Sequence, residues 1–236
     1  MNKAKKIIHR IGVSENPILQ IVTRLLSWPV KFGQFQLLKI NKDKEAVDLV
    51  QRIQRDGNSL MWPAEMIQLY FSVFATKKLP GDLAEVGVYA GRSARLIREV
   101  SPNKALHLFD TFEGLPKPTS MDNSTWHEHM LAIDLASVKK YLANYQNINF
   151  YLGTFPETAK PIEDRTFSFV HFDVDLHQST LECLKFFYPR MVKRGIMISH
   201  DYSNLAGVKK AFDEFFKDKD ESVIELSTSQ CIVIKS

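Results

Sequence analysis

The sequence predicts an α/β fold: a doubly wound, mostly parallel sheet with an antiparallel C-terminal hairpin and a helical N-terminal extension. Two observations lead to this prediction. From residue 82 onward, short apolar runs typical of strands alternate with segments of helical periodicity, the order found in sheets that are covered by helices on both faces. The last two runs, 223–226 and 230–236, stand close enough together to form a hairpin at the sheet edge.

The expected elements follow one another in a regular order. Helices are expected at 45–54 and 63–78, because apolar residues recur there about every 3.6 positions and Pro63 suits a first-turn position. The expected strands are 82–88, 105–110, 148–153, 167–174 and 195–201. The expected helices between and after them are 91–100, 137–145, 179–192 and 207–217. We therefore expect two domains, an extension over 1–78 and a sheet domain over 79–236.

The charge of the chain is unevenly distributed. Residues 1–44 carry nine basic and two acidic side chains, a net charge of +7, so the remaining residues carry −3. The apolar part of this segment contains Arg24, Pro29 and Lys31, which argues against a membrane-spanning helix. We interpret the segment as a packing arm or a dimer contact, with peripheral contact to an anionic membrane surface as the alternative.

Composition limits the other partners and the compartment. The sheet domain is net negative and lacks a basic stripe with interleaved aromatic residues, so no nucleic-acid partner is expected. Cys183 and Cys231 each stand in an apolar pattern, which predicts buried, reduced thiols in a cytoplasmic protein. The N-terminus shows no small-residue cleavage site of the signal-peptide type.

A glycine turn joins the first expected strand to its helix, in the stretch EVGVYAGRS. A dinucleotide fingerprint would require glycine where Tyr89 stands, so a pyrophosphate would be crowded. Glu85 would repel a phosphate but attract a cationic ligand. Asp110 ends the second strand, where a carboxylate suits the two hydroxyls of a ribose. These residues predict a site that binds a nucleoside but has no loop for a phosphate. S-adenosylmethionine fits such a site better than NAD.

Two acids follow the apolar run of the fourth strand, in VHFDVDLHQST. Asp173 and Asp175 stand at the carboxyl end of that strand, where open α/β sheets carry their sites. A charge in an apolar setting costs several kcal/mol unless it is paired or bound. Either these acids line a site, or Asp175 is solvated and Ser179 caps the next helix.

Five motifs in this order resemble the macrocin O-methyltransferase (TylF-like) family: AEVGVYAGRSARLI, LHLFDTFEGLP, GTFPET, FDVDLHQSTLECLKFFYPRMVKRG and ISHDY. The resemblance covers roughly residues 60 to 236. Members of this family are class I S-adenosylmethionine-dependent enzymes with a Rossmann-like fold, and they methylate sugar hydroxyls. The resemblance implies a small-molecule acceptor, a sugar or glycoside, and makes self-association an expectation.

The resemblance also assigns roles to individual residues. Asp175 is the implied general base. Apart from the resemblance, His177 is a candidate reserve base because the ordinary pKa of histidine is about 6.5, and the alternative is a loop histidine without a catalytic role. The residues implied in cofactor binding are Glu85, Gly87, Tyr89, Gly91, Ser93, Asp110, Thr111, Gly153, Thr154 and Asp173.

A divalent metal is the second implied cofactor. Asp173 and Asp201 match metal-binding aspartates of the family, but His200 stands where metal-dependent members have another aspartate. Mg²⁺ prefers oxygen ligands, and an imidazole suits it poorly. The departure leaves three alternatives: the metal is lost, binds more weakly, or is exchanged for a softer ion such as Mn²⁺.

The stretch 114–134 is too long and polar for an ordinary connection, which predicts a lid over the acceptor. Trp126 within it is a candidate for stacking on a sugar ring. The leading function is therefore O-methylation of a sugar, glycoside or related hydroxyl. The alternatives are an NAD-dependent oxidoreductase and an inactive module that binds S-adenosylmethionine.

Overall fold

A computed structural model describes residues 17–57, 59–122 and 126–236, and the basic residues before position 17 lie outside the described part. The chain forms two compact units, Met1–Ile67 and Gln68–Ser236. The division falls inside helix α4 (Pro63–Thr76). We expected the boundary at 78/79, and that domain assignment stays a prediction.

The first unit consists of α2 (Pro17–Asn41), α3 (Lys44–Arg55) and the first turn of α4. Asp43 begins α3, because its side chain accepts a hydrogen bond from the backbone N–H of Ala46. Buried apolar residues of α3 and the residue Phe35 of α2 contribute to the core of this unit. Among the helices of the described ranges, none combines the length and the hydrophobicity that crossing a bilayer requires.

The second unit contains a sheet of seven strands. They are β1 (Asp82–Val86), β2 (Leu106–Asp110), β3 (Ile148–Leu152), β4 (Phe167–Phe172), β5 (Met191–Ser199), β6 (Ile224–Glu225) and β7 (Cys231–Ile234). Their order in the sheet is β3-β2-β1-β4-β5-β7-β6. The first five strands are parallel, and β7 runs antiparallel to both β5 and β6. The predicted doubly wound sheet with an antiparallel end is confirmed.

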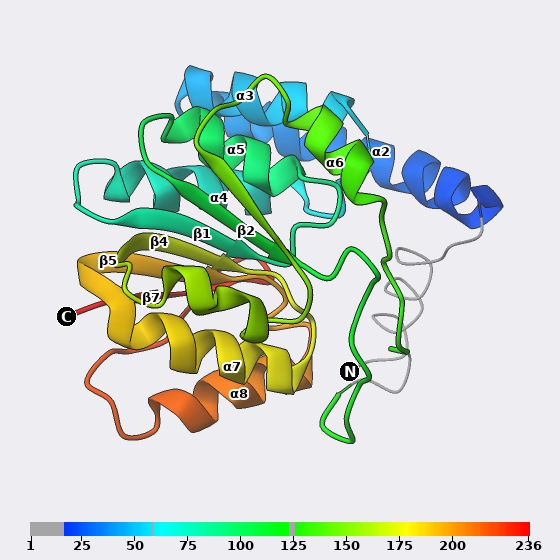
Figure 1. The fold of residues 1–236 in the computed structure, drawn as a ribbon. Coiled ribbons are helices and arrows are strands. Elements are labelled where there is room, and N and C mark those ends of the chain that lie inside the picture. The colour runs from blue at the N-terminus through cyan, green and yellow to red at the C-terminus, as the bar shows by residue number, and fades with distance from the viewer. Residues whose placement is uncertain (1–16, 58, 123–125) are drawn as a thin grey trace. The chain divides into compact units, whose positions relative to one another are not determined.

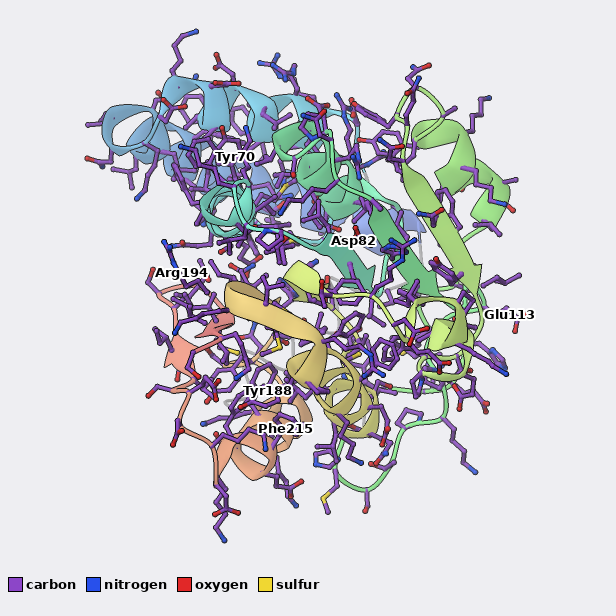
Figure 2. All side chains as sticks on the ribbon, turned by 60° about the vertical axis from the view of Figure 1, so that its left-hand side comes forward. Tyr70, Asp82, Glu113, Tyr188, Arg194 and Phe215 are labelled. Carbon is purple, nitrogen blue, oxygen red and sulfur yellow. The ribbon has the colours of Figure 1, made fainter. Side chains whose placement is uncertain are left out.

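Helices cover both faces of this sheet. They are α5 (Arg92–Val100), α6 (Leu135–Tyr141), α7 (His177–Phe187) and α8 (Ala206–Phe216), with short 3₁₀ helices η1 (Glu157–Ile162) and η2 (Tyr188–Arg190). In Figure 1, α5 and α6 lie on one side of the strands, and α7 and α8 lie on the other. The aromatic rings of Tyr188 and Phe215, labelled in Figure 2, meet edge to face at 5.4 Å where η2 approaches α8.

Element boundaries depart from the prediction around residue 190. The helix expected over 179–192 begins earlier, at His177, and β5 already begins at Met191. Pro189 has no backbone N–H and ends the regular α-helix, so the chain passes through η2 into the strand. Cys183 and Cys231 are both buried and free, as expected.

Candidate active site

The sequence-predicted site residues come from the carboxyl ends of the five parallel strands β1 to β5 and from the first turns of α5 and α7. The chain winds outward in opposite directions from β1 and β4, which are neighbours in the sheet. A crevice for a ligand is expected at such a switch point, because the connections on its two sides diverge.

The glycine turn after β1 lies directly against the end of β4. Gly87 has a φ of +86°, and a Cβ at this position would lie 1.9 Å from the backbone oxygen of Asp173. No other residue type fits there without moving one of the two strands. Gly91, at φ +74°, begins α5. The absence of a side chain at Gly87 therefore brings the predicted cofactor turn and the predicted acids together.

The carboxylate of Asp110 holds the turn in shape. Its Oδ2 accepts hydrogen bonds from the backbone N–H groups of Val88 at 2.7 Å and Tyr89 at 2.9 Å. Its Oδ1 accepts a third from Phe112 at 2.7 Å. A carboxylate offers about four acceptor positions, so these bonds leave room for about one more. The predicted contact with two ribose hydroxyls is untested, and this geometry favours a contact with one.

Glu85 lies beneath the turn, with none of its side chain exposed. Its Oε1 is 2.8 Å from Nδ1 of His171, the residue paired with it on β4. Burial raises the pKa of Glu85, although hydrogen bonds to His171 and Ser93 act in the opposite direction. Glu85 and Ser93 therefore contact each other under the turn, and their predicted cofactor contacts stay predictions.

An acid cluster, which we define as Asp173, Asp175, His200 and Asp201, gathers at the ends of β4 and β5. Nδ1 of His200 lies 3.2 Å from Oδ1 of Asp173 and 3.0 Å from Oδ2 of Asp201. Asp175 and Asp201 both have left-handed backbones, at φ +60° and +56°. Non-glycine residues in that region carry about 1–3 kcal/mol of strain, and such strain is concentrated at functional sites.

The cluster changes the proton affinity of its members. Desolvation by the surrounding protein, and then the negative charges of Asp173 and Asp201, raise the pKa of Asp175 well above its usual range. Burial alone would lower the pKa of His200, but Asp201 and Asp173 more than compensate and raise it well above its usual range. The site thus combines a carboxylate of raised proton affinity with an imidazole whose proton is stabilised by two aspartates.

The long loop between β2 and α6 is tied down at both ends and near its middle. Near the end of β2, the backbone N–H of His129 donates to the oxygen of Leu115 at 2.9 Å, and the N–H of Leu115 donates to the oxygen of Met130 at 2.8 Å. In the middle, Oδ1 of Asp122 accepts a hydrogen bond of 2.7 Å from the backbone N–H of His177. The loop therefore joins the end of β2 to the start of α7, two residues after Asp175.

The family-model comparison matches the macrocin-O-methyltransferase (TylF) model over residues 64–227, which is more than half of the chain. This protein belongs to the TylF family. The family that the motifs resemble is thereby confirmed.

Curated relatives agree with the family. A tetracenomycin-C rhamnosyl 4'-O-methyltransferase of Streptomyces olivaceus is 28% identical over 141 residues, 53% of this chain and 54% of the relative. Demethyldecarbamoylnovobiocin O-methyltransferase of Streptomyces niveus is 27% identical over 154 residues, 58% of each chain. The TylF-family chain spans about half the length of the curated relatives it matches.

Solved structures show the same fold. The O-methyltransferase NovP has a TM-score of 0.68 at 23% identity, over 75% of this chain and 82% of its own. The calicheamicin methyltransferase CalS11 has a TM-score of 0.59 at 18% identity, over 82% of this chain and 94% of its own. At these identities the comparison establishes the class I methyltransferase fold of the TylF-family chain.

Three members of the acid cluster have the donor set of a cation site. One ligand atom each from Asp173, His200 and Asp201 lies within 4.8 Å of the others. Two carboxylates and an imidazole fit Mn²⁺ or another ion of intermediate softness better than Mg²⁺. A bound cation would also have to displace the proton that Asp173 and Asp201 stabilise on His200.

The remaining predicted residues of the TylF-family chain have hydrogen-bond partners outside this cluster. His177 directs Nε2 to Glu214 on α8 at 2.9 Å, so its role as reserve base stays a prediction. Thr111 donates to the backbone oxygen of Gly114 at 2.6 Å and shapes the loop after β2. The backbone N–H of Gly153 donates to the oxygen of Asp110 at 3.0 Å.

Thr154 begins the turn after β3, where its backbone oxygen accepts a hydrogen bond from Thr158. Trp126 is buried, with 6% exposed, so a stacking role for its indole stays a prediction as well.

Sequence reasoning missed two residues that organise the site. Asp122 caps α7 from 55 residues away, and His171 pairs with Glu85 from 86 residues away. The segment Thr119–Asp122 has the local pattern of a turn, and Thr119 does donate to Asp122. That pattern reveals the turn but not its partner on α7.

Proposed function

We propose that this TylF-family chain is an S-adenosylmethionine-dependent O-methyltransferase that acts on a hydroxyl of a sugar, a glycoside or a related small molecule. The observation that supports this most is the contact between Gly87 and the backbone of Asp173. It puts a glycine turn suited to a nucleoside beside a cluster of acids suited to a hydroxyl. The curated relatives are themselves named as methyltransferases of a rhamnosyl tetracenomycin and of demethyldecarbamoylnovobiocin.

The chemistry requires an oxygen nucleophile with its proton removed. When bound, S-adenosylmethionine supplies a methyl group on a cationic sulfur, so the C–O bond forms as the S–C bond breaks. Asp175 accepts the hydroxyl proton, and its raised pKa makes it a stronger base than an ordinary carboxylate. Asp173 and Asp201 accept hydrogen bonds from neighbouring hydroxyls of the acceptor, and His200 balances their charge.

A divalent cation is the alternative to these contacts between the acceptor and the acid cluster. Asp173, His200 and Asp201 would hold it, and it would lower the pKa of an acceptor hydroxyl beside Asp175. A cytoplasmic location is also proposed, and the two buried free thiols support a reducing compartment.

A dinucleotide oxidoreductase is a weaker candidate on the same fold. Tyr89 stands in the glycine turn with φ +44°, where a pyrophosphate would require a small residue. The three backbone N–H groups nearest to Asp110 are also already bonded to its carboxylate. They are therefore not available to an anion.

Calorimetry on the purified chain tests the proposal. S-adenosylhomocysteine and S-adenosylmethionine are expected to bind, and NAD is not. Methyl transfer to a panel of glycosides, measured by mass spectrometry, then separates an enzyme from an inactive binding module. Binding of NAD without S-adenosylmethionine binding would overturn the proposal.

A further inference from the structure

The outer face of α2 exposes more large apolar side chains than any other element in the described part of the chain. Seven of them are between 52% and 79% exposed, namely Val30 and six larger ones: Leu25, Leu26, Trp28, Phe32, Leu37 and Ile40. Soluble proteins rarely leave such a patch uncovered, and its presence points to an interaction surface. We call these six residues the α2 face.

Contacts on the side of α2 opposite the α2 face fix the rotation of the helix about its own axis within the first unit. Phe35 is buried, Nζ of Lys31 donates to Gln54 on α3 at 3.3 Å, and Oε1 of Gln34 accepts from the backbone N–H of Ala64. Leu26 and Leu37 are separated by about three helical turns, so they lie on the same side of the helix. The α2 face is therefore turned outward.

The positive charge of α2 favours an anionic partner for the α2 face. The described helix α2 carries basic residues, such as Lys39, and no acidic residue at all. Lys42 follows directly, and the nearby acid Asp43 is used to begin α3. A second copy docking by the same face would bring like charges together. An anionic surface would attract the same charges.

Two aromatic residues of the α2 face also favour a membrane surface as the partner. The rings of Trp28 and Phe32 stack at 5.6 Å with an interplanar angle of 22°. Exposed tryptophan and phenylalanine beside lysine are typical of helices that lie in the headgroup region of a bilayer. Since α2 is not apolar enough to cross a membrane, its axis would lie parallel to the surface.

We propose that α2 binds the surface of an anionic lipid bilayer, with the α2 face inserted at the acyl boundary and the lysines at the headgroups. None of the residues of the α2 face belongs to the proposed active site. Its test uses no cofactor and no acceptor, so it stands or falls independently of the methyl-transfer proposal.

Flotation of the full chain with vesicles tests the proposal directly. We expect binding to vesicles of equimolar phosphatidylglycerol and phosphatidylcholine, and little binding to phosphatidylcholine alone. Raising the salt to about 0.5 M should weaken binding, because charges at the surface are screened. Absence of binding to the anionic vesicles, or equal binding to both kinds, would overturn the proposal.

Two sets of variants separate the apolar and the charged contributions. Leu25→Gln, Leu26→Gln and Leu37→Gln together should weaken vesicle binding by about tenfold or more. The matched control replaces three exposed apolar residues elsewhere by glutamine: Leu152, Ile224 and Ile234. Lys39→Gln with Lys42→Gln should weaken binding roughly fivefold per lysine. The charge control, Lys193→Gln with Lys217→Gln, should leave binding unchanged.

Competing occupants of the α2 face give different results. If a second copy covers it, light scattering will show a dimer that the three leucine substitutions dissociate, and vesicles will not bind. If another part of the same chain covers it, those substitutions will lower the melting temperature, again without vesicle binding. Either result overturns the proposal, whereas an unchanged melting temperature with lost vesicle binding supports it.

Discussion

The carboxylate of Asp122 accepts a 2.7 Å hydrogen bond from the backbone N–H of His177, 55 residues further along the chain. Helix α7 has no capping side chain of its own, because Leu176 occupies the N-cap position. Asp122 supplies the missing cap from the loop after β2. The same contact fixes that loop beside Asp175, so the order of the loop and the start of α7 depend on each other.

The effect of a substitution at Gly207 on stability should depend on whether Asp122 is present. Asp122→Ala removes a helix cap, which typically costs about 0.5–2 kcal/mol. Gly207→Ala should also destabilise, because a Cβ at Gly207 would lie 2.8 Å from Oδ1 of Asp122. In the Asp122→Ala background that obstacle is gone, and alanine is the better helix residue. We therefore expect Gly207→Ala to be much less destabilising there.

Denaturant unfolding of the two single variants and the double variant measures this coupling. Asp122→Asn is the matched control, since its amide oxygen can still accept the bond from His177. Equal effects of Gly207→Ala in both backgrounds would show that the contact does not carry the coupling.

Gly87→Ala should be among the most damaging single substitutions in the chain. The new Cβ would overlap the backbone of Asp173, at a φ that side chains rarely adopt. We expect a loss of about 3 kcal/mol or more in the free energy of unfolding, together with lost binding of S-adenosylhomocysteine. Gly33→Ala is the control, since nothing lies within 4 Å of its added Cβ and α2 is helical there. A Gly87→Ala variant that melts like the wild type would contradict the close approach.

Asp175→Asn tests the proposed base. Removing a general base typically lowers turnover by about 10²–10⁴-fold, while the affinity for S-adenosylmethionine should hardly change, since Asp175 is not assigned to the cofactor. In the wild type, turnover should rise with pH through the raised pKa of Asp175, because only the ionised form accepts a proton. Steady-state kinetics over a pH series measures both effects, and unchanged turnover in the variant would remove Asp175 from this role.

The same variant should be more stable than the wild type at neutral pH. The pKa of Asp175 is raised in the folded state, so the folded protein binds this proton more tightly than the unfolded chain does. Its contribution to stability is therefore greatest at low pH and is lost as pH rises through the folded pKa. Asparagine carries no such charge, and we expect a melting temperature higher by a few degrees at pH 7. The difference should vanish near about pH 4, and a difference independent of pH would argue against the raised pKa.

We expect His200 to decide which cation the acid cluster prefers. With an imidazole beside Asp173 and Asp201, we expect Mn²⁺ to bind more tightly than Mg²⁺. His200→Asp provides an all-oxygen set and should reverse that preference by about tenfold. Calorimetric titration of both ions into both proteins is the measurement. His200→Gln is the control for loss of the ring, and an unchanged preference in His200→Asp would exclude His200 as a ligand.

Most of the sheet could be predicted from the sequence because its signals are local. Apolar runs such as 105–110 and 167–174, glycine at positions 87 and 91, and the helical periodicity of 207–217 each depend on neighbours within one or two turns. The end of the helix near Pro189 was misplaced, because a 3₁₀ turn and a strand there compete with a continuing apolar pattern.

The sequence by itself determined the family, the order of strands and helices, and the residue types at the carboxyl edge of the sheet. The tertiary structure alone decided which of those residues meet. Asp122 reaches His177, and Glu85 reaches His171, across 55 and 86 residues. Asp110 likewise holds the turn in shape, through hydrogen bonds to Val88, Tyr89 and Phe112. A carboxylate in a sequence can take many partners, and only the register of parallel strands and the course of the loops between them select one.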